Sequence, residues 1–99
     1  MVLIVRSATF DRWLRRLRDA SARARILVRI TRLAQGNPGD TRSVGQGISE
    51  LRVDYGPGYR VYFMRRGDRV AVLLCGGDKS SQAADIALAK SIADQWSET

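Results

Sequence analysis

The sequence predicts a single α+β domain in which a helical hairpin packs on one face of a small, mostly antiparallel sheet. Its 99 residues suit one domain, residues 1–99, and leave no room for two. Apolar residues recur at helical spacing in the first third of the chain and near its C-terminus, and they alternate at strand spacing in between. A Gly-Pro-Gly turn joins two of the alternating runs, as in a β-hairpin. The expected order of elements is therefore β-α-α-β-β-β-α.

The N-terminal third is expected to form one strand and two helices. Residues 1–6 are almost continuously apolar, which is typical of a strand covered on both faces. Thr9 is a suitable N-cap for a helix over residues 10–20, and Ser21 for a second helix that ends at Gly36. The tight junction between the helices implies an antiparallel hairpin. The residues expected to face inward are Phe10, Trp13, Leu14 and Leu17, then Ile26, Leu27, Ile30, Leu33 and Ala34.

The rest of the chain is expected to contain a loop, three strands and a last helix. Residues 36–47 hold five Gly or Pro in twelve positions, which indicates a loop. The three expected strands are residues 48–55, 59–65 and 69–75. After them, Ser80 or Ser81 is the expected N-cap of a helix that runs to about Trp96. Its expected inward stripe is Ile86, Ala89, Ile92 or Ala93, and Trp96.

The hairpin around Gly56-Pro57-Gly58 gives the expected sheet one apolar and one polar face. If Tyr55 pairs with Tyr59, the pairs on the apolar face are Val53 with Val61 and Leu51 with Phe63. The pairs on the polar face are then Asp54 with Arg60, Arg52 with Tyr62, and Glu50 with Met64. An Arg66-Gly67 turn would extend the apolar face by pairing Val70 with Phe63 and Val72 with Val61, leaving Leu73 and Cys75 on the polar face.

Charge and composition narrow the classes of function. Seventeen Lys and Arg against ten Asp and Glu give a net charge of +7, which favours a polyanionic partner, either nucleic acid or an acidic protein. Solubility alone, or a GC-rich coding sequence, also accounts for the excess of Arg. The chain has no His and only Cys75, so neither an internal disulfide nor a His-ligated metal site is expected. The apolar opening is too short for a signal peptide or a membrane span, and a cytoplasmic location is expected.

Several motifs together resemble a known family. The segments are FDRWLRRLRD, GNPGD, ELRVDYGPGYRVYF, and LLCGGDKSSQ followed by DI. Over about residues 4–93 they are similar to the RelE/ParE superfamily of bacterial toxins, and most similar to its HigB-like "addiction module killer protein" branch. The most specific parts are ELR, GPGYRVYF and GGDKSSQ-x₂-DI. Members of this superfamily share the fold expected above.

The resemblance implies a ribosome-dependent endoribonuclease that inhibits translation. RelE-like toxins bind messenger RNA in the ribosomal A site and cleave it without a metal or cofactor, through attack of the ribose 2′-OH on the adjacent phosphate. Such a reaction needs cations for the developing charge and groups that move two protons. The catalytic residues that the resemblance implies are Arg60, Lys79, Arg52 and Asp85. The implied RNA-binding residues are Tyr62, Tyr55 and Arg52.

Each of these assignments has a structural alternative. The sequence pattern alone slightly favours a cross-strand ion pair between Asp54 and Arg60. Arg52 with Glu50 also fits a solvated edge of the sheet, and Tyr62 fits a half-buried position. Lys79 serves as well in the lead-in to the last helix, and Asp85 fits the dipole of that helix. Other members carry a Tyr after the last strand or rely on a His. Here Asp85 stands near that place instead.

The resemblance also implies partners and leaves alternatives. A cognate antitoxin, typically a small helix-turn-helix DNA-binding protein, would neutralise the toxin, and a higher-order toxin–antitoxin complex is expected with it. Ribosome and messenger RNA are the implied targets, and no membrane is involved. Two alternatives remain open at this point. One is a ParE-type poison of DNA gyrase. The other is a non-toxic module that binds nucleic acid or an acidic protein through its basic surface.

Overall fold

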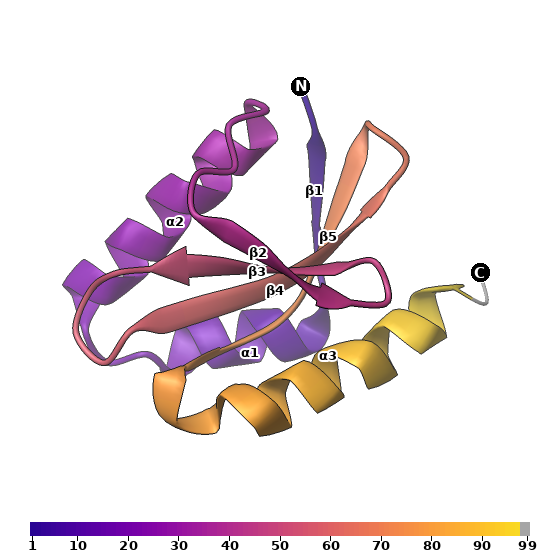
Figure 1. The fold of residues 1–99 in the computed structure, drawn as a ribbon. Coiled ribbons are helices and arrows are strands. Elements are labelled where there is room, and N and C mark those ends of the chain that lie inside the picture. The colour runs from indigo at the N-terminus through magenta and orange to yellow at the C-terminus, as the bar shows by residue number, and fades with distance from the viewer. Residues whose placement is uncertain (98–99) are drawn as a thin grey trace.

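The computed structural model describes residues 1–97 and has the expected α+β architecture, with helices on both faces of a mixed sheet (Figure 1). The elements are β1 (Leu3–Arg6), α1 (Ala8–Arg16), α2 (Ala20–Ala34), β2 (Thr41–Gly45), β3 (Ile48–Val53), β4 (Tyr59–Arg66), β5 (Val70–Asp78), the 3₁₀ turn η1 (Lys79–Ser81) and α3 (Gln82–Ser97). The strand order is β1-β5-β4-β3-β2. β1 runs parallel to β5, and the other neighbours are antiparallel.

Two apolar clusters hold the layers together. On one face of the sheet, α1 and α2 pack through Phe10, Leu14, Ile26, Ile30 and Leu33 against Leu51, Val53, Val61, Phe63, Ala71 and Leu73. On the other face, α3 packs through Ala89, Ile92 and Ala93 against Ile48, Tyr62, Met64, Val72, Leu74 and Cys75. Full burial of one large apolar side chain contributes about 1.5–3 kcal/mol. The helical hairpin is therefore confirmed on one face, and α3 covers part of the opposite face.

The apolar stripes of the helices are confirmed except at Leu27, and in the N-terminal segment expected to be covered on both faces Met1 and Leu3 are exposed. Leu27 is 40% exposed and Leu3 is 64% exposed. Leu27 directly follows the buried Ile26, and 100° of helical rotation per residue carries it off the core stripe. Leu3 belongs to β1, which lies at the edge of the sheet. The prediction that this strand is covered on both faces is therefore wrong at Leu3.

The helix caps differ from those expected. Ser7, not Thr9, caps α1 by accepting the backbone N–H three residues ahead at 2.9 Å. Asp19, not Ser21, caps α2 with a carboxylate oxygen that accepts two backbone N–H groups at 2.9 and 3.2 Å. Asp78 caps η1, and α3 follows that turn without either serine as its cap. In each case the capping residue is a Ser or Asp that lies two or more residues N-terminal to the residue expected as the cap.

The β3–β4 register is two residues away from the expected one. Val53 pairs with Tyr59, and Arg52 with Arg60, because Asp54 and Tyr55 belong to the turn. The expected Asp54–Arg60 pair is therefore wrong. A shift of two residues leaves every side chain on its original face, so the predicted apolar and polar faces of the hairpin are confirmed.

On the loop side of a bulge, the β4–β5 register differs from the expected one by an odd number of residues, so the faces change there, and beyond the bulge the expected faces return. Residues 67–69 form a three-residue loop, with Gly67 at φ 65° and Val70 opposite Arg66, and a bulge follows between Tyr62 and Phe63. Val70 and Val72 consequently lie on the face covered by α3, and Leu73 lies on the face of the helical hairpin. Cys75 is on the α3 face, as expected.

One strand was not expected from the sequence. β2 lies within residues 36–47 and pairs antiparallel with β3. The connection passes through Gln46 and Gly47, which both have positive φ, 56° and 75°, as a tight hairpin turn requires. Its sequence, TRSVG, lacks the apolar alternation that marks a half-buried strand. Within residues 1–97 we find no helix with the length and apolarity that crossing a membrane requires.

Candidate functional site

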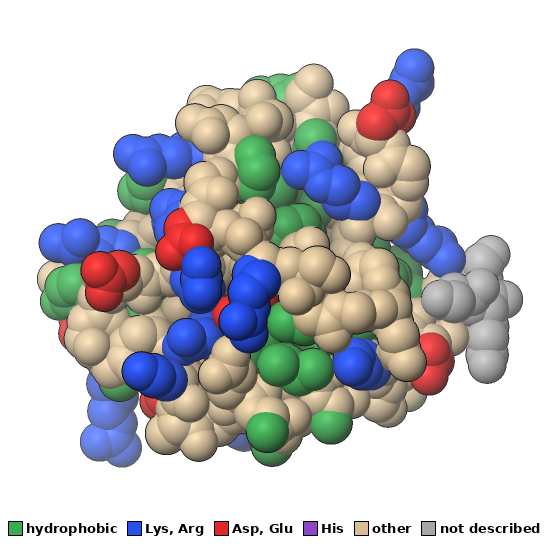
Figure 2. All heavy atoms as spheres, viewed as in Figure 1, with side chains coloured by type: hydrophobic (Ala, Val, Ile, Leu, Met, Phe, Trp, Pro, Cys, Tyr) green, Lys and Arg blue, Asp and Glu red, His purple; other side chains and the backbone are tan. Residues whose placement is uncertain are grey.

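A group of basic side chains lies where α3 leaves the sheet uncovered. Arg52 and Arg60 project from β3 and β4, and Lys79 begins η1 at the end of β5. The three residues line a pocket of about 280 Å³. Asp40, Val53, Asp54, Gly58 and Tyr59 complete its lining. Figure 2 shows this region as a group of basic side chains with acidic side chains beside it. The pocket thus gathers three of the residues that the sequence analysis named.

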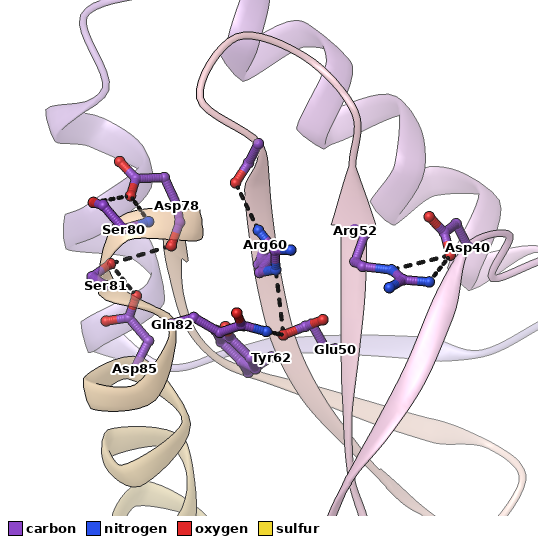
Figure 3. Close-up of polar contacts among 11 residues, drawn as sticks. Asp40, Glu50, Arg52, Arg60, Tyr62, Asp78, Ser80, Ser81, Gln82 and Asp85 are labelled. Carbon is purple, nitrogen blue, oxygen red and sulfur yellow. Dashed lines mark hydrogen bonds and ion pairs between the residues drawn. The ribbon is translucent and has the colours of Figure 1, made fainter.

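Arg60 is fixed within the pocket by contacts at both ends of its guanidinium. One terminal nitrogen donates to the carbonyl of Gly58 at 3.2 Å. The Nε atom lies 3.4 Å from a carboxylate oxygen of Glu50, and the side chain is only 13% exposed (Figure 3). Gly58 has φ 83°, and a Cβ built there would lie 3.6 Å from Arg60 and 3.8 Å from Lys79. Arg60 and Lys79 therefore approach each other over the hairpin turn.

Glu50 is the residue of this site that sequence reasoning did not select. It is completely buried, and its Oε2 atom accepts hydrogen bonds from the Tyr62 hydroxyl at 3.3 Å and the Gln82 amide at 2.8 Å. Its Oε1 atom has no hydrogen-bond partner among the described residues. Burying a carboxylate costs several kcal/mol unless a cation and hydrogen bonds accompany it. The Arg60 guanidinium supplies the cation, so the charge of Glu50 holds Arg60 in place.

Arg52 is held by a different carboxylate. Its Nε and a terminal nitrogen donate to Asp40 Oδ1 at 3.2 and 2.7 Å (Figure 3). This hydrogen bond lowers the pKa of Asp40 and raises the pKa of Arg52. Arg29 of α2 secures the loop behind the pair by donating to the carbonyls of Arg52, Pro38 and Asp40, and burial lowers its pKa. Arg52 is therefore positioned by the loop that precedes β2.

The two expected RNA-binding tyrosines lie outside the pocket. Tyr62 is completely buried beneath α3, and desolvation, with the nearby charge of Glu50, raises its pKa. It is not available to stack on a base in this conformation. Tyr55 lies in the hairpin turn, packed against the face of the helical hairpin, with the Arg25 guanidinium 4.4 Å above its ring. Neither ring contributes to the lining around Arg60.

Asp85 lies next to the pocket but does not line it. Its carboxylate accepts a hydrogen bond from Ser81 Oγ at 2.5 Å (Figure 3). A Cβ at Gly77, which pairs with Arg60 in the sheet, would fall 1.8 Å from Asp85 Oδ2. The absence of a side chain at Gly77 therefore creates the space that this carboxylate occupies.

Comparison with known proteins gives the family of the chain. The profile described as "Phage derived protein Gp49-like (DUF891)" matches residues 12–96. A protein of Haemophilus influenzae, strain Rd, described as "Uncharacterized protein", is 49% identical over 94 residues, which cover 95% of each chain. The matched profile spans most of the chain, including α2, every residue of the basic pocket and most of α3. The chain therefore belongs to the Gp49-like family, which is a RelE/toxin-like family.

Proposed function

We propose that the chain is the toxin of a type II toxin–antitoxin pair, of the HigB-like branch, and that it cleaves translated messenger RNA. Membership of a RelE/toxin-like family supports the toxin role. The observation that carries the cleavage role is the basic pocket, in which Arg60 is anchored by the buried Glu50 and stands beside Arg52 and Lys79. A pocket with three cations suits a phosphodiester, whose charge increases in the transition state.

The roles of the cations follow from their contacts. The Nε of Arg60 faces Glu50 and one terminal nitrogen donates to Gly58, which leaves the other terminal nitrogen and the second N–H of the first as donors to the non-bridging oxygens of a scissile phosphate. Arg52 is oriented by Asp40 and adds a second positive charge. One positioned donor to such a transition state is worth about 3–4 kcal/mol. Arg60 is therefore the residue whose loss we expect to reduce the rate most.

Two proton transfers complete the proposed reaction. The 2′-OH gives its proton to a carboxylate, its oxygen bonds to phosphorus, and the 5′-oxygen leaves with a proton from an acid. Asp54 lines the pocket, and no ion pair engages its carboxylate among residues 1–97, so we assign it as the acceptor. Lys79, exposed at the rim, is the donor to the leaving oxygen. The products are a 2′,3′-cyclic phosphate and a 5′-hydroxyl end. Asp85, bonded to Ser81, has a positioning role for η1.

We propose that the ribosome positions the RNA, because the pocket itself offers little that could hold a base in place. The pocket has a volume of only about 280 Å³, and both aromatic residues expected to hold a base lie outside it. Correct positioning of reacting groups is worth about 7–11 kcal/mol in well-oriented reactions. We therefore expect slow cleavage of free RNA and fast cleavage of a message bound in the A site.

The test is controlled expression in bacteria. We expect growth arrest, a fall in translation and new transcript ends within coding regions, and we expect co-expression of the protein encoded by the adjacent reading frame to prevent all three. The Arg60→Met/Glu50→Gln variant should be inactive. The control Arg12→Met removes a charge from the exposed face of α1 and should remain toxic. Growth arrest with gyrase-linked DNA breaks and intact transcripts would replace this proposal with the gyrase-poison alternative.

A further inference from the structure

A second hollow, larger than the basic pocket, lies between α2 and the end of β3. Its volume is about 530 Å³, and it opens on the face of the sheet that carries the helical hairpin. We call it the α2 groove. The residues that matter for its chemistry are Ala24, Arg25, Val28, Arg32 and Tyr55. Because Val53 and Asp54 line both hollows, the α2 groove and the basic pocket share a wall.

Helix α2 presents two stripes, and only one of them is used by the core. The buried stripe is Ala22, Ile26, Ile30 and Leu33. Ala24 and Val28 belong to the second stripe and are spaced by one helical turn, with Val28 49% exposed and Leu27 beside it 40% exposed. A solvated helix face normally carries long polar side chains at such positions. The small and apolar residues here leave a floor on which another chain can approach closely.

The lining of the groove holds three arginines and one carboxylate, that of Asp54, and two of the arginines form no ion pair within residues 1–97. The Arg25 guanidinium lies over the ring of Tyr55, and neither Arg25 nor Arg32 has an ion-pair partner among residues 1–97. By contrast, Arg52 and Arg60 each face a carboxylate. An apolar floor between unneutralised cations is complementary to an amphipathic segment with acidic side chains.

We propose that the α2 groove binds an acidic, amphipathic segment of a protein partner. Aliphatic side chains of that segment rest on Ala24 and Val28, and its carboxylates meet Arg25 and Arg32. The floor favours protein over RNA because it offers aliphatic surface, and its one aromatic face, that of Tyr55, is already covered by Arg25. The identification of this partner with the antitoxin rests on the proposed function.

The partner would reach the chain without entering the basic pocket. Arg60 projects from the α3 face of the sheet, whereas α2 packs on the opposite face. Apart from Asp54, which lines both hollows, the residues of the groove are therefore separable from the residues proposed for cleavage. Neutralisation through the groove would act across the shared wall at Val53 and Asp54, by excluding the ribosome or by fixing the hairpin turn.

The test uses the product of the adjacent reading frame as the probe. Reversing two rim charges with Arg25→Glu/Arg32→Glu should weaken its binding about tenfold or more, because attraction becomes repulsion at the rim. The matched control Arg12→Glu/Arg16→Glu makes the same charge change on α1 and should alter the affinity less than about twofold. A photocrosslinking amino acid at position 28, in the Arg60→Met/Glu50→Gln background, should attach to an acidic segment of the probe.

The outcomes separate this inference from the proposed function. Growth arrest by the unaltered chain, together with equal affinities of both charge-reversed variants, overturns the groove and leaves the toxin role intact. Crosslinking at position 28 to RNA, or the absence of any adduct with the probe, likewise overturns it. Failure of the unaltered chain to arrest growth overturns the toxin role, whereas an adduct at position 28 would still support the groove.

Discussion

Removing the charge of Arg60 alone should destabilise the fold, whereas removing it together with the charge of Glu50 should not. In Arg60→Met the apolar stem remains, but the completely buried Glu50 carboxylate loses its only ion pair among the described residues. In Arg60→Met/Glu50→Gln no charge is left buried at this place. The Gln side chain can still bond Tyr62 and Gln82, the partners of the original carboxylate.

The magnitude follows from the contacts of the pair. Breaking a buried ion pair by removing one partner costs about 3–5 kcal/mol. Glu50 keeps two hydrogen bonds, and Arg60 is 13% exposed, so we expect the lower end, about 3 kcal/mol. For a chain of this length that loss lowers the Tm by about 12 °C or more. The double variant should lie within about 1 kcal/mol of the parent, since replacing both partners of a buried pair is often nearly neutral.

The measurement is urea unfolding followed by tryptophan fluorescence for the parent, both variants and Arg52→Met. Arg52 pairs with the exposed Asp40, so its removal should change stability by less than about 1 kcal/mol. The reasoning fails if Arg60→Met is as stable as the parent, or if adding Glu50→Gln does not restore stability. Both Arg60 variants should be catalytically inactive, which separates the loss of activity from the loss of stability.

Three further predictions concern other parts of the fold. Burial raises the pKa of Cys75 to about 12, so at about pH 8 a thiol reagent should react with it only when the chain unfolds, and rapid labelling of the folded protein would contradict its burial. The hydrogen bond from Arg52 holds the pKa of Asp40 below 3.8, so this pair stabilises the fold above about pH 4 and loses its effect as the pH falls through the lowered value. Asp40→Asn should therefore reduce the dependence of the urea midpoint on pH in the acid range, and an unchanged dependence would argue against the pair. A Cβ at Gly76 would lie 2.3 Å from the ring of Trp13, so Gly76→Ala should cost about 1–3 kcal/mol and change the fluorescence of that ring, whereas parent-like stability would show that α1 can move aside.

The features that local periodicity determines could be predicted from the sequence. The core stripe of α1, with Phe10 and Leu14 buried, follows from helical spacing. The two faces of the β3–β4 hairpin follow from alternation. They were predicted correctly although the predicted register was wrong by two residues, because every second side chain of a strand points to the same face. For the same reason Arg52 and Arg60 were correctly assigned to one face.

The features that depend on irregular backbone or on packing between distant segments could not be predicted from the sequence. The loop at residues 67–69 shifts β5 by an odd number of residues up to the bulge after Tyr62, and no residue pattern marks that bulge. The burial of Glu50 and Tyr62 arises because α3 folds back over the sheet, with Gln82 reaching the Glu50 carboxylate. Alternation did place Glu50 on the same face as Arg60. An acidic residue beside a candidate phosphate-binding arginine was therefore the signal in the sequence that could have selected Glu50.

The central claim is that the basic pocket cleaves messenger RNA on the ribosome. The most direct measurement adds the purified chain to a defined translation complex and maps the 5′ ends of the message by primer extension. We predict cuts within the A-site codon that persist in a metal chelator under conditions that keep the ribosome intact. These cuts should disappear in Arg60→Met/Glu50→Gln and remain in the α2-groove variant Arg25→Glu/Arg32→Glu. An intact message, with the same preparation trapping gyrase on DNA, would contradict the account.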